Sequence, residues 1–121
     1  MKISLDKLIS RIVALGVPGL VLVVAVFLTG LAGGAAIVAA LAMLGGPFGM
    51  VGGVLLLGLL VLISQALSEY GFETIFVRVL RGLKAKGYKK ADILKKIDSY
   101  PISIELKLKL KAYVEQFWGE D

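Results

Sequence analysis

Residues 12–68 have the sequence IVALGVPGLVLVVAVFLTGLAGGAAIVAALAMLGGPFGMVGGVLLLGLLVLISQALS. This stretch contains no charged residue, although it fills nearly half of the 121-residue chain. A helix crosses a bilayer core with roughly 20 apolar residues, so the stretch is too long for one crossing and suits two. The sequence therefore predicts an all-α membrane protein built on a two-helix transmembrane hairpin over residues 17–68.

The composition of the whole chain agrees with this prediction. Hydrophobic residues make up 58% of it and the mean hydropathy is +0.88, whereas soluble domains are roughly 45–50% apolar. A small soluble fold leaves much of its surface in water and has little room to bury so many apolar side chains. The alternative is a soluble all-α protein in which the hairpin forms a buried centre.

The turn of the hairpin is predicted at residues 45–49, where Gly45, Gly46 and Pro47 stand together. Glycine relaxes the backbone, and proline breaks a preceding helix and favours the first turn of the next one. The first span would then run over residues 20–44 and the second over residues 48–68. A second interpretation adds a turn at residues 30–34 and gives three spans over 12–29, 35–49 and 52–68, of which the middle one is short.

Small residues recur along both predicted spans at spacings that let membrane helices approach closely. With the turn centred on Gly46, Gly34 lies opposite Gly58, and Ala39 lies opposite Gly53. The predicted helix-packing residues are Gly30, Gly34, Ala39, Gly49, Gly53 and Gly58. These rows could close one hairpin on itself or join several copies, so we expect a homo-oligomer.

Amphipathic segments flank the uncharged stretch. Residues 1–16 are predicted to form an interfacial helix with Ser4 as its N-cap, followed by a break at residues 17–19; a signal peptide is the alternative for this end. Residues 69–84 have apolar side chains at steps of three and four, which predicts a juxtamembrane helix with a possible bend at Gly71.

Residues 85–121 are predicted to form a basic cytoplasmic tail of two short helices. Residues 102–111 alternate between apolar and polar side chains, which is also a strand pattern. We favour a helix over residues 103–118, because Ser103 is a suitable N-cap and a lone strand would have no partner. Phe117 and Trp118 are either anchors for a protein partner or part of the core of the tail.

Both flanks are basic, and the net charge is +5. Lys and Arg accumulate on the cytoplasmic side of membrane segments, so an even number of crossings places both termini in the cytoplasm, at an inner or plasma membrane. Anionic lipid headgroups beside a membrane helix explain the basic cluster better than nucleic acid does. The predicted headgroup contacts are Arg78, Arg81, Lys84, Lys86, Lys89 and Lys90.

The sequence offers little for catalysis. It has no Cys and no His, which excludes disulfides, Cys or His metal sites, thiol nucleophiles and His acid–base chemistry. Phosphate-loop, dinucleotide-binding and hydrolase motifs do not occur, and the carboxylates are scattered among lysines. We therefore expect neither an enzyme nor a cofactor or metal site.

Three functional hypotheses remain. The first is a self-associating membrane protein that forms a pore or a membrane-perturbing assembly. In composition, residues 17–68 are similar to the hydrophobic hairpins of colicin-type pore formers and other α-helical membrane toxins, and this similarity implies such an assembly. The second is a membrane anchor or adaptor that recruits a cytoplasmic partner through residues 85–121. The third is an accessory subunit of a larger membrane complex.

Overall fold

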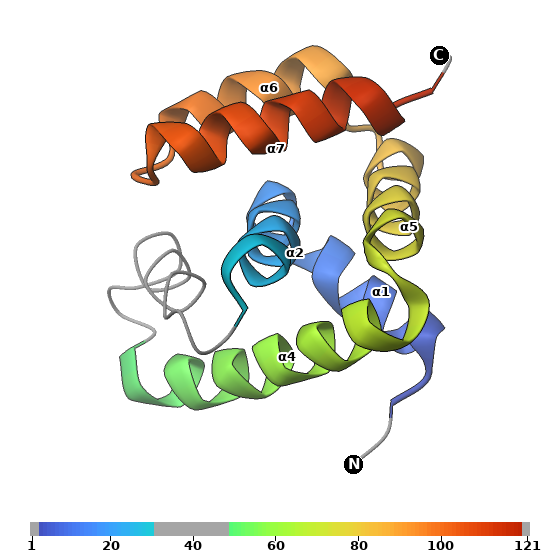
Figure 1. Ribbon diagram of the computed structural model, residues 1–121, viewed down its shortest axis with the longest axis vertical. Helices are drawn as coiled ribbons and strands as arrows, with labels where there is room; N and C mark the ends of the chain where they lie inside the picture. Colours follow the sequence, from blue (N-terminus) through green and yellow to red (C-terminus); the bar gives the residue numbers. More distant parts are fainter. Residues whose placement is uncertain (1–2, 31–48, 120–121) are drawn as a thin grey trace.

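The structure of the chain is a computed structural model that describes residues 3–30 and 49–119, with side chains in the second range described from Leu57 onward. Every regular element in these residues is an α-helix (Figure 1), as the sequence predicts. The helices are α1 (Leu5–Ala14), α2 (Val17–Thr29), α4 (Gly49–Tyr70), α5 (Phe72–Ala85), α6 (Lys90–Ser99) and α7 (Ile104–Phe117).

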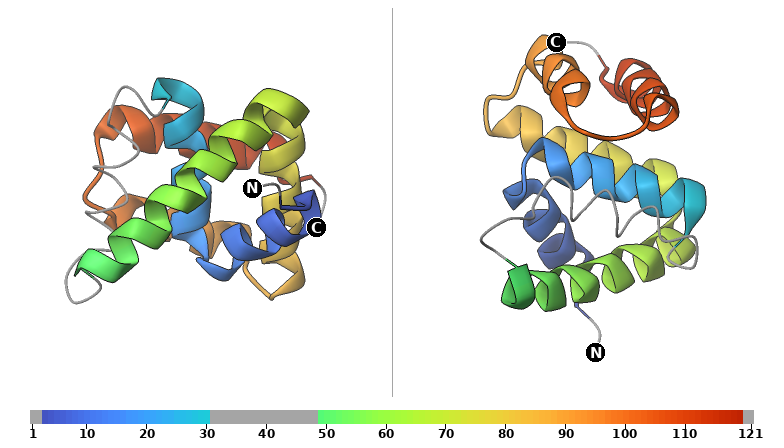
Figure 2. Two further views of the ribbon diagram at one scale, coloured as in Figure 1. Left: turned by 90° about the horizontal axis from the view of Figure 1, so that it is seen from below. Right: turned by 90° about the vertical axis from the view of Figure 1, so that its left-hand side faces the viewer.

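Helix α2 lies at the centre and packs against each of the other described helices. The α6–α7 pair covers one side of it and α4 covers the opposite side, while α1 and α5 lie beside it (Figures 1 and 2). Its side chains from Leu20 to Ala25 are almost completely buried. The apolar faces of α1 and α5 pack into the same core, as expected for amphipathic helices.

Two glycines with positive φ separate the apolar helices from their amphipathic neighbours. Gly16 has φ +76° between α1 and α2, and Gly71 has φ +88° between α4 and α5. Each junction bends the chain by 120°. The bend predicted at Gly71 is confirmed, whereas the break predicted at residues 17–19 occurs at Gly16 instead, because Pro18 fits the first turn of α2.

Within the described residues, no single helix combines the length and the apolar composition of a membrane span. Two bent pairs of helices reach that length and composition only when both helices of a pair are taken together. The first pair is Leu5–Ala14 with Val17–Thr29, and the second is Leu57–Tyr70 with Phe72–Ala85. The all-helical part of the predicted fold class is therefore confirmed, and its transmembrane part remains a proposal.

The predicted first span over residues 20–44 is wrong as one unbroken helix, because α2 begins at Val17 and ends at Thr29. Gly30 leaves the helix with φ +66°, while its N–H still donates to the Val26 carbonyl oxygen at 2.8 Å. A left-handed glycine is a common helix end. The second predicted span is close to α4, and the predicted turn at Gly45, Gly46 and Pro47 lies outside the described residues.

The predicted caps and the helical tail are confirmed. The Ser4 side chain accepts a hydrogen bond from the Lys7 N–H at 3.3 Å, and the Ser103 side chain accepts one from the Leu106 N–H at 3.1 Å. Residues 104–117 form α7 rather than a strand, and α7 packs against α6. The N-terminal capping bond and the good helix formers that follow it therefore outweigh the alternating pattern.

Two helical glycines allow α1 to approach its neighbours closely. A Cβ atom on Gly19 of α2 would collide with the carbonyl oxygen of Ile12, which is backbone and cannot rotate away. A Cβ atom on Gly82 of α5 would lie 2.5 Å from Cγ2 of Val13. At the sequence level Gly19 belongs only to the predicted break at residues 17–19, and Gly82 has no assigned role, because the atoms that each glycine meets belong to another helix.

Replacing Gly19 by alanine is expected to destabilise the fold by about 1–3 kcal/mol, the usual cost of overpacking. Gly58→Ala is the matched control, since no described atom lies within 4 Å of the added Cβ and alanine is favoured over glycine inside a helix by about 1 kcal/mol. Denaturant unfolding followed by circular dichroism measures both changes. Equal stability of the two variants would contradict the close contact between α1 and α2.

Candidate functional site

Four large apolar side chains of the uncharged stretch are exposed on the described parts of α2 and α4. Phe27 and Leu28 end α2, and Leu57 and Val61 lie one turn apart on α4, which packs against α2. Leu57 is 47% exposed and Val61 is 45% exposed. These four residues, named here the apolar edge, belong to the uncharged stretch and carry no polar side-chain atom.

Of the six predicted helix-packing residues, four lie in the described helices or at their ends, and two lie outside the described residues. Gly58 lies on α4 between the exposed Leu57 and Val61, and no described atom comes within 4 Å of a Cβ built on it. Gly30 ends α2 and likewise has no described atom near such a Cβ. Gly49 and Gly53 lie in the first turns of α4, where side-chain surroundings are not described. Gly34 and Ala39 lie outside the described residues, so the predicted pairing of the two rows remains a prediction.

Phe72 connects the central helix, α5 and the tail. Its ring stacks on Phe27 with centroids 4.2 Å apart and lies 4.8 Å from the ring of Tyr113. Phe76 and Phe117 complete the cluster at centroid distances of 5.2 and 6.4 Å from Phe72. Aromatic pairs in this range contribute about 0.5–1.5 kcal/mol each beyond their buried area. The cluster therefore holds α7 against the helices that contain and follow the uncharged stretch.

The end of the tail is part of this core rather than a free anchor. Trp118 is buried, and the Lys84 Nζ lies 4.7 Å from its ring centroid and donates to its carbonyl oxygen at 3.2 Å. Phe117 is half-buried within the aromatic cluster. Of the two interpretations that the sequence allows, the structure favours the one in which both residues form the core of the tail.

The six residues predicted to bind headgroups divide into two groups. Arg78 pairs with Asp6 at 3.6 Å, Lys90 pairs with Glu115 at 3.4 Å, and Lys84 contacts Trp118. Arg81, Lys86 and Lys89 are exposed. The ion pairs lie in water and contribute little to stability, so Arg78 and Lys90 remain able to exchange partners.

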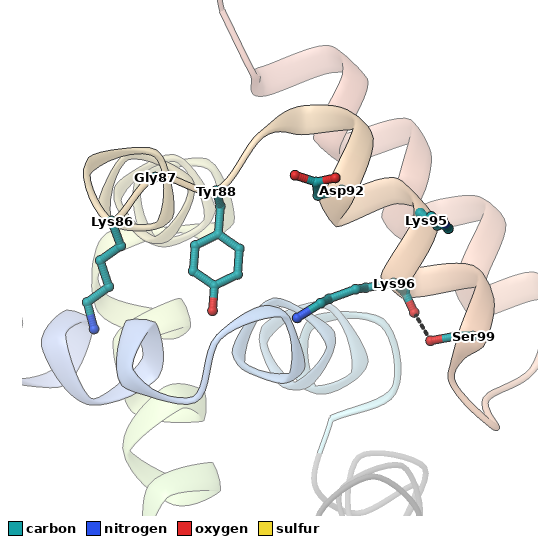
Figure 3. Close-up of a pocket in the computed structure, with 7 residues that line it drawn as sticks. All are labelled: Lys86, Gly87, Tyr88, Asp92, Lys95, Lys96 and Ser99. Carbon is teal, nitrogen blue, oxygen red and sulfur yellow. Dashed lines mark hydrogen bonds between the residues drawn. The ribbon is translucent and has the colours of Figure 1, made fainter.

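Lys86 lines a hollow of about 540 Å³ between the end of α5 and one face of α6. The other residues around it are Gly87, Tyr88, Asp92, Lys95, Lys96 and Ser99 (Figure 3). The chain turns at Gly87, which has φ +95°, and the ring of the next residue, Tyr88, points toward the α1–α2 junction (Figure 3). Lys95 and Lys96 also line this hollow, although they were not among the predicted headgroup residues.

Close to this hollow, Tyr100 titrates abnormally. Its partial burial raises the pKa of the Tyr100 phenol above the usual 10.0, and the neighbouring Tyr88 raises this pKa further. Both effects disfavour the phenolate, so Tyr100 is neutral at physiological pH. Among the described residues, no group of three Asp or Glu side chains is placed to hold a metal ion.

In comparisons with protein-family models, with curated proteins and with solved structures, nothing matches this chain. Its function therefore has to be argued from the apolar edge, the aromatic cluster and the basic residues themselves.

Removing the central ring of the aromatic cluster is expected to loosen the tail. Phe72→Ala removes the ring contacts to Phe27, Tyr113 and Phe117 and should cost about 3 kcal/mol. Trypsin should then cut faster at Lys86 and Lys89, which connect α5 to α6. Tyr70→Ala serves as the control, because Tyr70 is exposed and has no ring contact among the described residues. Similar cleavage rates in the two variants would show that the cluster does not hold the tail.

Proposed function

We propose that this chain is a small integral membrane protein that self-associates through its uncharged glycine- and alanine-rich segment and forms a membrane-perturbing assembly. The observation that carries the proposal is the apolar edge. Phe27, Leu28, Leu57 and Val61 are exposed on the two helices of the uncharged stretch, where lipid would cover them favourably. Each large side chain removed from water contributes about 1.5–3 kcal/mol when it is fully buried.

The two glycine bends support a division of roles along the chain. Apolar helices α2 and α4 meet amphipathic α1 and α5 at Gly16 and Gly71, each with a 120° change of direction. A basic amphipathic helix is suited to the headgroup plane and an uncharged helix to the bilayer core. At 1.5 Å per residue, α2 covers about 20 Å, so a full crossing of about 30 Å would draw further residues from the uncharged stretch beyond Thr29.

Both flanks of the uncharged stretch lie side by side, which supports an even number of crossings. Helix α1 packs against α5, with Val13 against Gly82 and the Arg78–Asp6 ion pair bridging the two helices. Two flanks that remain in contact stay on one face of a membrane. The basic residues on both flanks favour the cytoplasmic face at a plasma or inner membrane.

Self-association is proposed through the exposed face of α4. Leu57, Gly58 and Val61 combine a small residue with apolar neighbours on one helical face. Helices in lipid associate through close packing of this kind, since burial from water supplies no driving force there. Two helices per chain enclose no channel, so perturbation of a membrane requires several copies.

A lysine on the apolar edge is expected to reduce membrane insertion without disturbing the described fold. Leu57→Lys adds a charge near the middle of the second predicted span at a cost of about 2.5–3.5 kcal/mol. Leu108→Lys is the matched control, because Leu108 is a 61% exposed leucine on α7, outside the uncharged stretch. Flotation with vesicles of phosphatidylcholine and phosphatidylglycerol measures insertion, and release of a trapped dye measures perturbation.

The proposal predicts that Leu57→Lys loses both signals and that Leu108→Lys retains them. Equal insertion of the two variants would contradict a membrane-embedded α4. A native chain that floats with vesicles but releases no dye and remains monomeric would contradict the assembly while leaving membrane association intact. Circular dichroism of both variants before vesicles are added tests whether either substitution has unfolded the chain.

Enlarging Gly58 separates association from insertion. Gly58→Leu increases the hydrophobicity of α4 but prevents close approach of a second helix, so we expect insertion without oligomers. Ala91→Leu on the exposed surface of α6 adds similar bulk away from that face. Mass measurement in mild detergent should show oligomers for the native chain and for Ala91→Leu, but not for Gly58→Leu. Oligomers of unchanged mass in Gly58→Leu would exclude this face as the contact.

A second candidate function, the membrane anchor or adaptor, is favoured by a different observation. Ile104 and Leu108 lie one turn apart on α7 and are 76% and 61% exposed, which gives the tail an outward apolar ridge. Such a ridge suits a partner helix or groove. The adaptor would lose a specific partner in Leu108→Lys and keep it in Leu57→Lys, the reverse of the result expected for the membrane-perturbing assembly.

A further inference from the structure

The hollow beside Lys86 combines positive charge with two hydroxyl groups, of which the Ser99 hydroxyl already donates within α6. Three of its lining residues are lysines, Tyr88 and Ser99 contribute hydroxyl groups, and Asp92 is its single carboxylate. The Lys86, Lys95 and Lys96 ammonium groups form no ion pair with any described residue. By contrast, Lys90 and Lys111 pair with Glu115 and Asp98 at 3.4 and 2.9 Å. Among the described residues, the lining therefore has more positive than negative charge, because three lysines stand against one carboxylate.

Tyr88 and Lys96 give the hollow a defined wall. The Lys96 Nζ lies 5.8 Å from the centroid of the Tyr88 ring, and the side chain reaches from α6 toward the tyrosine hydroxyl (Figure 3). The Ser99 hydroxyl donates to the Lys96 carbonyl oxygen at 2.6 Å, which fixes the last turn of α6. The Tyr88 hydroxyl oxygen lies 3.0 Å from where a Cβ on Gly16 would be, so the end of this ring packs closely against the α1–α2 junction, where Gly16 has φ +76°.

We infer that this hollow binds a phosphate monoester attached to a hydroxylated group. Lysine ammonium groups bind phosphate as point charges, and Lys86 and Lys96 line the hollow from two different segments, on either side of the Tyr88 ring (Figure 3). The Tyr88 hydroxyl is placed to donate to a phosphate oxygen, and Asp92 accepts from a hydroxyl of the attached group. A volume of about 540 Å³ exceeds what a single phosphate ion fills and leaves space for a glycerol- or sugar-sized group.

The same chemistry occurs in the headgroup of an anionic lipid and in a soluble phosphomonoester. The lipid alternative rests on the proposed function, because it requires the hollow to face a membrane surface. The hollow adjoins Gly16, where the uncharged stretch turns away from α1, so a headgroup bound there would lie level with the start of α2. The soluble alternative needs no membrane at all.

The experiment compares two variants that lose the same net charge. Lys86→Gln with Lys96→Gln removes two ammonium groups from the hollow, whereas Lys7→Gln with Lys109→Gln removes two exposed ammonium groups elsewhere. In the first arm, glycerol 3-phosphate is titrated by calorimetry into full-length protein in a maltoside detergent. In the second arm, flotation is measured with vesicles of phosphatidylcholine alone and with phosphatidic acid added.

We expect saturable binding of glycerol 3-phosphate that weakens about tenfold or more in the hollow variant and less than about threefold in the control, since a charge-assisted hydrogen bond is lost. A matching loss of the preference for phosphatidic acid assigns the hollow to a lipid headgroup, and an unchanged preference assigns it to a soluble phosphomonoester. Equal weakening in both variants, or no saturable binding by the native chain, would overturn the inference. Because the first arm involves no bilayer, its failure is distinct from a failure of Leu57→Lys to reduce insertion.

Discussion

The fold depends on the burial of one helix that has no charged residue. Helix α2 is covered by each of the other described helices, and residues 20–25 on it are almost inaccessible to water. Full burial of each valine or leucine contributes about 1.5–3 kcal/mol, so the burial of α2 contributes a large part of the folding free energy of this small chain. The amphipathic α1, α5, α6 and α7 can supply this cover because each has an apolar face.

Local sequence signals were sufficient where a structure is decided within a few residues. Ser4 and Ser103 cap their helices, and the apolar side chains of α5 are spaced for one buried face. The end of α2 was only partly predictable. The glycines at residues 30–34 allow a turn there, as the second interpretation has it, but hydropathy is continuous through Thr29 and Gly30 and does not choose between that turn and one long span. Likewise, Gly19 and Gly82 acquire their importance from Ile12 and Val13 on another helix.

In the candidate site, too, local signals were sufficient for some features and contacts between helices decided others. The charges along the sequence correctly identify a basic region after the uncharged stretch, but they do not distinguish one basic residue from another. The structure instead places Lys84 over Trp118 and Lys90 beside Glu115, and the turn at Gly87 puts Lys86 and Lys96 on the lining of one hollow. Phe117 and Trp118 could be assigned to the core of the tail only once Phe72 and Phe76 were placed against α7. These are long-range contacts, which periodicity does not encode.

The cover of α2 comes from surfaces that are held in place in different ways. The faces of α6 and α7 that pack on α2 are apolar and complete its burial. The aromatic contacts around Phe72 and the Lys84–Trp118 contact keep these faces in position, because they join the tail to α5. The α1–α5 contact instead joins the two flanks of the uncharged stretch. Packing between the flanks therefore brings the two ends of the uncharged stretch together, while the tail covers the side of α2 that lies opposite α4.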